Sequence, residues 1–260
     1  MKQTILNTNQ STLLEDLIVK YGQIVTSDQI YNQAEGLWNQ QRTKKEIVKL
    51  TRNGWLIRVK RGLYAISDLS NRGFLSLSPY VVANLLVKDS YVSFESALSY
   101  HSMFDQLTQK TISISQVRYK TVQLQSIEYS FVTVLDKWFF GWEEVSIDNK
   151  TVRMATAEKA LIDMIQFHKS KYTVDLVIEK LSLYRDSLDL QKMTEYLGKM
   201  SLITAKTFGF LFDLLGIDSS DLKTQVKLKG THCMLAGDTK FNAKWRIYYD
   251  AYFDKYQAIK

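Results

Sequence analysis

Basic side chains are concentrated in one short part of the sequence, residues 40–62. This window holds eight lysines and arginines and one acidic residue, so it carries the whole formal net charge of +7. The rest of the chain holds 26 basic and 26 acidic residues and sums to zero. Lysine and arginine both bind phosphate, lysine as a point charge and arginine through a fork of N–H donors. A confined basic patch is therefore the electrostatic footprint expected of a nucleic-acid-binding protein.

Residues of known catalytic motifs do not occur at the spacing that those motifs need. The chain has one cysteine, Cys233, and its three histidines (His101, His168 and His232) are far apart in sequence, so no zinc site is expected. The sequence contains no glycine-rich phosphate-binding motif and no nucleophile elbow. We therefore expect no catalytic residue, no metal and no cofactor, and we interpret the protein as a non-enzyme.

Two other groups of charged residues are interpreted as structural. Glu143, Glu144 and Asp148 flank strand-like residues and a turn, which is typical of a solvated hairpin rather than of a metal-dependent nuclease. Lys159 and Asp163 are four residues apart on an expected helix, and this spacing predicts an ordinary surface ion pair.

Capping signals define three short helices around the basic window. The first is expected over residues 11–22, starting at Ser11 or Thr12 and ending at Gly22. The second starts at Thr26, which forms a capping box with Gln29.

The third helix carries half of the basic patch. Thr43 and Glu46 match a second capping box, so this helix is expected to run from Lys44 to about Arg52, with Asn53-Gly54 as its stop. Its side chains are expected to divide into a basic side with Lys45, Lys49 and Arg52 and an apolar side with Ile47 and Leu50.

A basic hairpin follows the third helix. Alternating apolar and polar residues over 55–60 predict one strand, Lys60-Arg61-Gly62 a turn, and residues 63–66 a second strand. Three helices followed by a hairpin predict a winged helix-turn-helix, in which the third helix enters the major groove and the hairpin reaches the backbone or the minor groove. The predicted DNA-binding residues are Arg42, Thr43, Lys44, Lys45, Lys49, Arg52, Arg58, Lys60 and Arg61.

The remaining sequence predicts a second, larger domain of mixed α+β structure. An apolar helix is expected at 79–87, a short strand leading into a helix at 91–104, and four or five antiparallel strands over 111–155. The aromatic run 138–142 is interpreted as a strand with alternate members in the core. Helices follow from Thr156 onwards, and two strand-like pieces lie at 225–229 and 243–253. The predicted domains are residues 1–78, a winged helix-turn-helix, and residues 79–260, an α+β domain.

Four segments resemble the AbiEi antitoxin family in order and spacing. They are RNGWLIRVKRGLYAIS, YVSFESALSYHSM, VRMATAEKALIDMI and AKWRIYYD, and the resemblance spans nearly the whole chain. The sequence departs from the family at Ser102 and Met103, where glycine and leucine are frequent, and at Ala157, where proline is frequent. These are packing or capping positions.

The resemblance implies a type IV toxin–antitoxin system linked to abortive infection by phage. The N-terminal winged helix would bind inverted repeats in double-stranded DNA and repress its own operon promoter. The C-terminal domain would neutralise an AbiEii-type nucleotidyltransferase toxin without a stable complex. The residues alone leave a second interpretation open, a winged-helix repressor whose C-terminal domain binds a small ligand or dimerises, with no toxin.

The compartment is predicted from three absences in the sequence. No stretch of 18 consecutive apolar residues is present, the N-terminus lacks the apolar region of a secretory signal, and a single cysteine cannot form an internal disulfide. We expect a cytoplasmic protein with no membrane partner.

Overall fold

The computed structural model describes residues 5–67, 70, 72–106, 109–226 and 229–259 of the chain. The chain divides into two compact units, the first made of residues 1–88 and 123–127 and the second of residues 89–122 and 128–260. The first unit thus ends about ten residues later than the predicted boundary at 78, because the helix α4 (Pro79–Leu86) contacts the strand β2 (Leu56–Lys60) and is counted with it.

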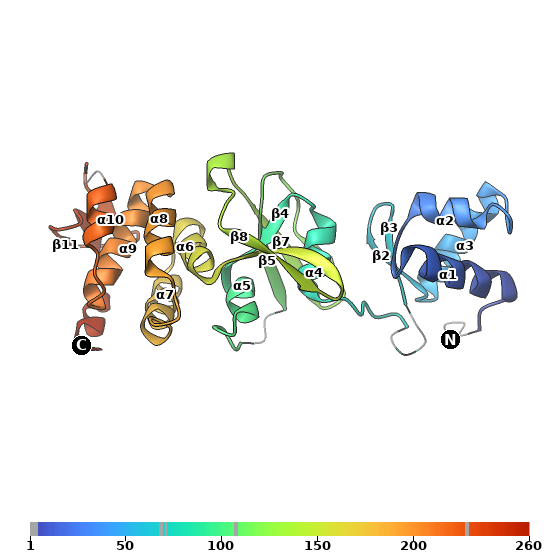
Figure 1. The fold of residues 1–260 in the computed structure, drawn as a ribbon, viewed down its shortest axis with the longest axis horizontal. Coiled ribbons are helices and arrows are strands. Elements are labelled where there is room, and N and C mark those ends of the chain that lie inside the picture. The colour runs from blue at the N-terminus through green and yellow to red at the C-terminus, as the bar shows by residue number, and fades with distance from the viewer. Residues whose placement is uncertain (1–4, 68–69, 71, 107–108, 227–228, 260) are drawn as a thin grey trace. The chain divides into compact units, whose positions relative to one another are not determined.

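Helices and a small sheet share one core in the first unit (Figure 1). The sheet has the order β1-β3-β2, and both of its pairings are antiparallel. Apolar side chains from α1, α2 and α3 meet those of the sheet, and Leu17, Val25 and Ile30 have no exposed surface. Besides β2 and α4, the elements are α1 (Thr8–Tyr21), β1 (Ile24–Thr26), α2 (Ser27–Ala34), α3 (Gln40–Arg52) and β3 (Leu63–Ile66).

Local signals placed most of these elements, with differences at the starts of α1 and α3 and at β1. The capping box of Thr26 with Gln29 is confirmed, and Gly22 ends α1 with a positive φ of 78°. The start of α1 was predicted too late, because Asn7 caps the helix in a capping box with Gln10. The strand β1 was not predicted, since its three residues are too few to show an alternating pattern.

The second unit is built on the strands β7, β5, β4, β9 and β8, which neighbour one another in that order within a six-stranded sheet that β6 completes. The predicted antiparallel sheet is corrected to a mixed one, because β5 pairs parallel with β7 and β4 pairs parallel with β9. Alternation along a strand reports which face is buried and says nothing about the direction of the neighbour. The strands are β4 (Ser90–Val92), β5 (Lys110–Ser115), β6 (Val122–Leu124), β7 (Ile127–Thr133), β8 (Trp142–Ile147) and β9 (Lys150–Ala155).

Helices follow the sheet and pack on one another, as α6 to α10 do in Figure 1. The helix α6 contacts α5, α7, α8 and α9, so it is buried on nearly all sides. The helices are α5 (Phe94–Tyr100), α6 (Ala157–Phe167), α7 (Lys171–Leu183), α8 (Leu190–Lys199), α9 (Leu202–Leu214) and α10 (Ser220–Gln225), with 3-10 turns η1 (Asp136–Trp138) and η2 (Ala251–Ile259).

A small second sheet lies near the C-terminus, with β10 (His232–Cys233), β12 (Ile247–Tyr249) and β11 (Lys240–Asn242) in that order. The strand predicted over 243–253 is thus shortened to β12, and η2 follows it. The strand predicted over 225–229 falls partly on residues 227–228, which lie outside the described residues.

Candidate nucleic-acid interface

The helix α3 separates its basic and apolar side chains onto two sides. Ile47 and Leu50 are buried in the core of the first unit, as predicted. Lys44, Lys45 and Arg52 are exposed on the opposite side. Within the described ranges, no ion pair or hydrogen bond engages these three cationic groups, so their charge faces solvent. Lys49 is half-buried at the edge of this basic side.

The start of α3 differs from the prediction, and one predicted DNA contact is lost with it. Asn39 is the cap, and its side chain accepts a hydrogen bond of 2.9 Å from the backbone N–H of Arg42. Thr43 lies one turn into the helix, is 2% exposed and donates its hydroxyl to the carbonyl of Asn39. A buried hydroxyl that is bonded to the Asn39 carbonyl does not reach a phosphate. We therefore remove Thr43 from the predicted DNA contacts. Lys44 and Lys45 likewise lie inside the helix rather than at its N-terminus.

Glu46, the one acidic residue of the basic window, points inward. Its carboxylate accepts a hydrogen bond of 2.7 Å from the side-chain amide of Gln10 on α1. It also pairs at 2.8 Å with Arg42, whose guanidinium remains partly exposed. Glu46 therefore anchors α3 to α1 and holds Arg42 in a fixed position beside the basic side of the helix.

The hairpin of β2 and β3 carries the other basic residues. Gly62 forms its turn with a φ of 76°, which glycine adopts without strain. The register shifts between Arg58 and Lys60, so Leu56 and Val59 are both buried and the predicted strict alternation is broken. A bulge of this kind places two residues of one strand opposite one residue of its partner.

The three basic residues of the hairpin are not equivalent. Arg58 and Arg61 are exposed. Lys60 is half-buried, and its Nζ donates a hydrogen bond of 3.2 Å to the carbonyl of Leu86 at the end of α4. This bond connects the hairpin to α4 and uses one of the three N–H donors of the ammonium group that was predicted to meet DNA.

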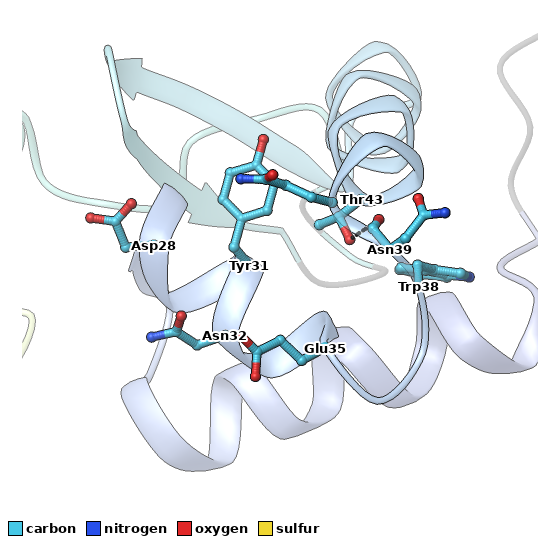
Figure 2. Close-up of a pocket in the computed structure, with 8 residues that line it drawn as sticks. Asp28, Tyr31, Asn32, Glu35, Trp38, Asn39 and Thr43 are labelled. Atoms are coloured by element: carbon cyan, nitrogen blue, oxygen red, sulfur yellow. Dashed lines mark hydrogen bonds between the residues drawn. The ribbon is translucent and has the colours of Figure 1, made fainter.

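A hollow of about 600 Å³ lies beside the start of α3 (Figure 2). Figure 2 shows Asp28 on α2 and Glu35 just after the end of this helix, with Asn39 and Thr43 across from them. Its lining among the described residues includes these two carboxylates and no lysine or arginine. Carboxylates repel phosphate, so this hollow is not suited to bind an anion, and the exposed basic side chains of α3 and of the hairpin do not line it.

In the second unit, Lys159 and Asp163 form a buried ion pair, which corrects the predicted surface pair. Asp163 also accepts hydrogen bonds from Ser93 at 2.8 Å and Tyr91 at 3.2 Å, and Lys159 donates to the Tyr91 hydroxyl at 2.9 Å. All four side chains have no exposed surface, so a substrate has no access to them. Burial raises the pKa of Asp163 and lowers the pKa of Lys159, while their mutual attraction opposes both shifts.

The aromatic run 138–142 covers this ion pair from a loop, and the predicted strand with alternate core members is wrong there. Only Trp142 belongs to a strand. The ring of Phe140 lies 4.8 Å from the ammonium of Lys159. Position 141 requires a glycine, because a Cβ there would come within 2.9 Å of the Lys159 side chain.

A second cavity, of about 330 Å³, lies in the second unit. Several titratable side chains line it, and the sequence did not predict that they would lie close together. One carboxylate oxygen of Glu95 is buried and has no hydrogen-bond partner among the described residues. The ring of His168 stacks on Phe94 at 4.3 Å, and Phe94 itself has a φ of +56°. The lining residues are Glu95, Ser96, Phe104, Gln106, Lys110, Ile112, His168 and Tyr172.

The electrostatics of this cavity centre on Glu95. Burial lowers the pKa of His168, and the charge of Glu95 opposes that shift. Burial also raises the pKa of Tyr172, with a further contribution from the charge of Glu95. The unpaired oxygen of Glu95 is an acceptor for a ligand with N–H donors.

Among the described residues, neither a metal site nor a membrane-spanning helix is found. The described residues contain no group of three histidine, cysteine or acidic side chains arranged to hold a metal ion. None of the described helices combines the length and the apolar composition that crossing a bilayer requires.

The two units thus define a mixed α+β chain whose first unit presents a basic helix face and a basic hairpin. The fold is similar to that of the Rv2827c protein from Mycobacterium tuberculosis, known from a crystal structure, with a TM-score of 0.68 and 12% sequence identity. The similarity covers 99% of this chain and 96% of the other. At this identity the similarity shows the fold alone. No model of a protein family matches the sequence, and no curated protein matches it significantly.

Proposed function

We propose that this protein is a cytoplasmic DNA-binding repressor and type IV antitoxin of the AbiEi kind. Its first unit acts as a winged helix-turn-helix that binds inverted repeats at its own promoter. Its second unit neutralises a nucleotidyltransferase toxin of the AbiEii kind without a stable complex. The proposal assigns no catalytic step, metal or cofactor to either unit.

One observation carries the DNA-binding part. The window that holds the entire net charge places Lys44, Lys45 and Arg52 on one exposed side of α3 and Arg58 and Arg61 on an exposed hairpin. The order of the elements, α1-β1-α2-α3-β2-β3, supports the winged helix-turn-helix assignment. In that arrangement α3 is the helix that enters the major groove, and the hairpin approaches the backbone.

The antitoxin part rests on the four resembling segments, and the structure gives three of them defined roles in the second unit. The segment 91–103 forms most of β4 and all of α5, and the segment 152–165 forms part of β9 and most of α6. Tyr91, Ser93, Lys159 and Asp163 come from these two segments and meet in the buried network. The segment 243–250 supplies Trp245, which has no exposed surface and packs on Gly209 of α9.

The salt dependence of DNA binding tests the repressor assignment. Each lost phosphate contact lowers the slope of log affinity against log salt concentration by about one. Arg61→Ala is expected to lower the slope by this amount on the promoter duplex, as measured by fluorescence anisotropy over a potassium chloride series. Lys60→Ala is the matched comparison: its half-buried ammonium already donates one hydrogen bond to the Leu86 carbonyl, so the slope is expected to change less than in Arg61→Ala. If Arg61→Ala leaves both the salt slope and the affinity for DNA unchanged, the hairpin is not part of the DNA-binding surface.

The cavity at Glu95 supports a second candidate function, a repressor whose second unit binds a small ligand. A cationic ligand with N–H donors, such as an amine or an amidine, would satisfy the unpaired Glu95 oxygen. Benzamidine is expected to raise the melting temperature of the wild-type protein and to leave that of Glu95→Gln unchanged. Equal responses of the two proteins to benzamidine would exclude Glu95 as its acceptor.

The titration of His168 tests the geometry of this cavity independently of any ligand. The charge of Glu95 holds the His168 pKa up against the effect of burial. Glu95→Gln is therefore expected to lower the His168 pKa further, as measured by NMR of the imidazole protons. Glu144→Gln, an exposed carboxylate on β8, is the control. An unchanged His168 titration in Glu95→Gln would show that the two groups do not interact.

A further inference from the structure

The exposed side of α3 has a central ridge with lysines on both flanks. At about 100° per residue, Gln41, Val48 and Arg52 lie within about 40° of one another around the helix axis. Lys44 lies to one side of this ridge and Lys45 to the other. All five side chains are exposed, opposite the buried side of the helix. The sequence did not predict this ridge, because the helix was expected to start after Gln41.

Val48 is the unusual member of this ridge. Its side chain is 63% exposed at the centre of the most basic surface of the chain. A single exposed apolar residue needs no explanation by itself. This position differs because every neighbour along the exposed side is polar or charged, and a valine gains nothing from phosphate. In the major groove, the apolar feature available to such a side chain is the methyl group of thymine.

The other two ridge residues have complementary chemistry. The amide of Gln41 carries a donor and an acceptor, which match the N6 and N7 edge of adenine. The guanidinium of Arg52 matches O6 and N7 of guanine. Lys44 and Lys45 on the two flanks would meet the phosphates on either wall of the groove. The helix face therefore combines base-reading side chains in the middle with phosphate-binding side chains at the edges.

We propose that Val48 and Gln41 determine the sequence specificity of DNA binding, Val48 by contacting a thymine methyl and Gln41 by pairing with an adenine. This inference rests on the proposed DNA-binding function and deepens it. Gln41 and Val48 are seven residues apart, which is about 10.5 Å along a helix. That distance is about three base-pair steps of 3.4 Å, so the adenine and the thymine belong to the same half-site.

Base analogues test the proposal atom by atom on the full-length protein. A preferred duplex is first selected from a random double-stranded library. Each thymine is then replaced by deoxyuridine, which removes only the methyl group. Wild-type affinity is expected to fall about fourfold at one thymine per half-site, the effect of one methyl-sized apolar group. Val48→Ala is expected to bind the thymine and uracil duplexes equally.

Adenine is tested in the same way with 7-deazaadenine, which lacks the N7 acceptor. Loss of a bidentate contact is expected to weaken wild-type binding about tenfold at one adenine per half-site. Gln41→Ala is expected to be insensitive to this replacement. Val19→Ala and Gln23→Ala, which change exposed residues of the same unit away from α3, are the controls and are expected to keep both wild-type responses.

Two failures are distinguishable. If Val48→Ala keeps the sensitivity to deoxyuridine, or if no thymine methyl affects wild-type binding, Val48 does not contact thymine. If Gln41→Ala keeps the sensitivity to 7-deazaadenine, or if no adenine N7 affects wild-type binding, Gln41 does not pair with adenine. If the wild-type protein selects no sequence and its binding does not depend on salt, the proposed function itself fails. Circular dichroism of each variant excludes loss of fold as the cause of a lost response.

Discussion

At the scale of single residues, burial decides what a charged side chain does. Lys159 and Asp163 have the spacing of a surface pair, yet both are fully buried and bound to each other. The sequence held a usable signal: α6 reads AEKALIDMIQF, with apolar residues on all sides of the helix, and such a helix is buried. A buried pair of charges is costly to break, because one partner remains without its counter-charge.

The first prediction concerns this pair. Lys159→Met is expected to lower the free energy of unfolding by about 3–5 kcal/mol at pH 7, as measured by urea denaturation. The loss is expected to shrink as the pH falls. Without its lysine, the buried Asp163 has a pKa in the folded state above its value in the unfolded state. As the pH falls from the folded-state pKa towards the unfolded-state pKa, the folded protein takes up a proton at Asp163 and regains stability.

Lys223→Met, an exposed lysine on α10, is the control for the change of residue type. It is expected to change the free energy of unfolding by less than about 0.5 kcal/mol, as surface substitutions usually do. A loss in Lys159→Met that does not depend on pH would contradict the assignment of an uncompensated Asp163 charge.

At the scale of elements, the cap residue decides which residues a helix presents. Thr43 and Glu46 fit the capping-box pattern, but Asn39 caps α3 and both of the others are buried. The capping-box pattern gave the wrong start because residues three positions apart also lie on the same side of a helix, and here Thr43 and Glu46 both lie on its buried side. The correct start adds Gln41 to the exposed side of α3 and removes Thr43 from it.

The second prediction tests this cap. Asn39→Ala is expected to lower the free energy of unfolding by about 1 kcal/mol, because the N–H of Arg42 loses its acceptor. Asn32→Ala, which changes an exposed asparagine inside α2, is the control and is expected to have a much smaller effect. If the two variants are equally stable, the cap at Asn39 does not contribute to the helix.

At the scale of the whole molecule, the chain divides into two compact units, and the two proposed activities are assigned to different units. The DNA-binding side chains proposed here all belong to the first unit, and the buried network and the cavity at Glu95 belong to the second. A substitution of exposed residues on α3 leaves the core of either unit intact.

The third prediction follows from this separation. The full-length triple variant Lys44→Ala, Lys45→Ala, Arg52→Ala is expected to lose repression of a promoter reporter and still to rescue cells that express the cognate toxin. Lys137→Ala, an exposed lysine of the second unit, is the control and is expected to keep both activities. If the triple variant no longer rescues, neutralisation depends on DNA binding and the two activities are not separable.

Sequence signals were sufficient where structure depends on neighbours along the chain. The window of excess charge, the capping box at Thr26, the N-cap at Thr156, the hairpin of β2 and β3 and the α+β class followed from local patterns. Each depends on contacts within a few residues, which composition and spacing report directly.

Tertiary structure alone decided which side chains remain available for binding. The burial of Thr43, the bond of Lys60 to Leu86, the buried Lys159–Asp163 pair and the parallel strands of the six-stranded sheet all depend on residues distant in the chain. The same holds for the convergence of Glu95 and His168 on one cavity. The sequence by itself determined where the positive charge lies, because charge is a property of residues; the fold decided which of those charges face solvent, because exposure depends on what packs against them.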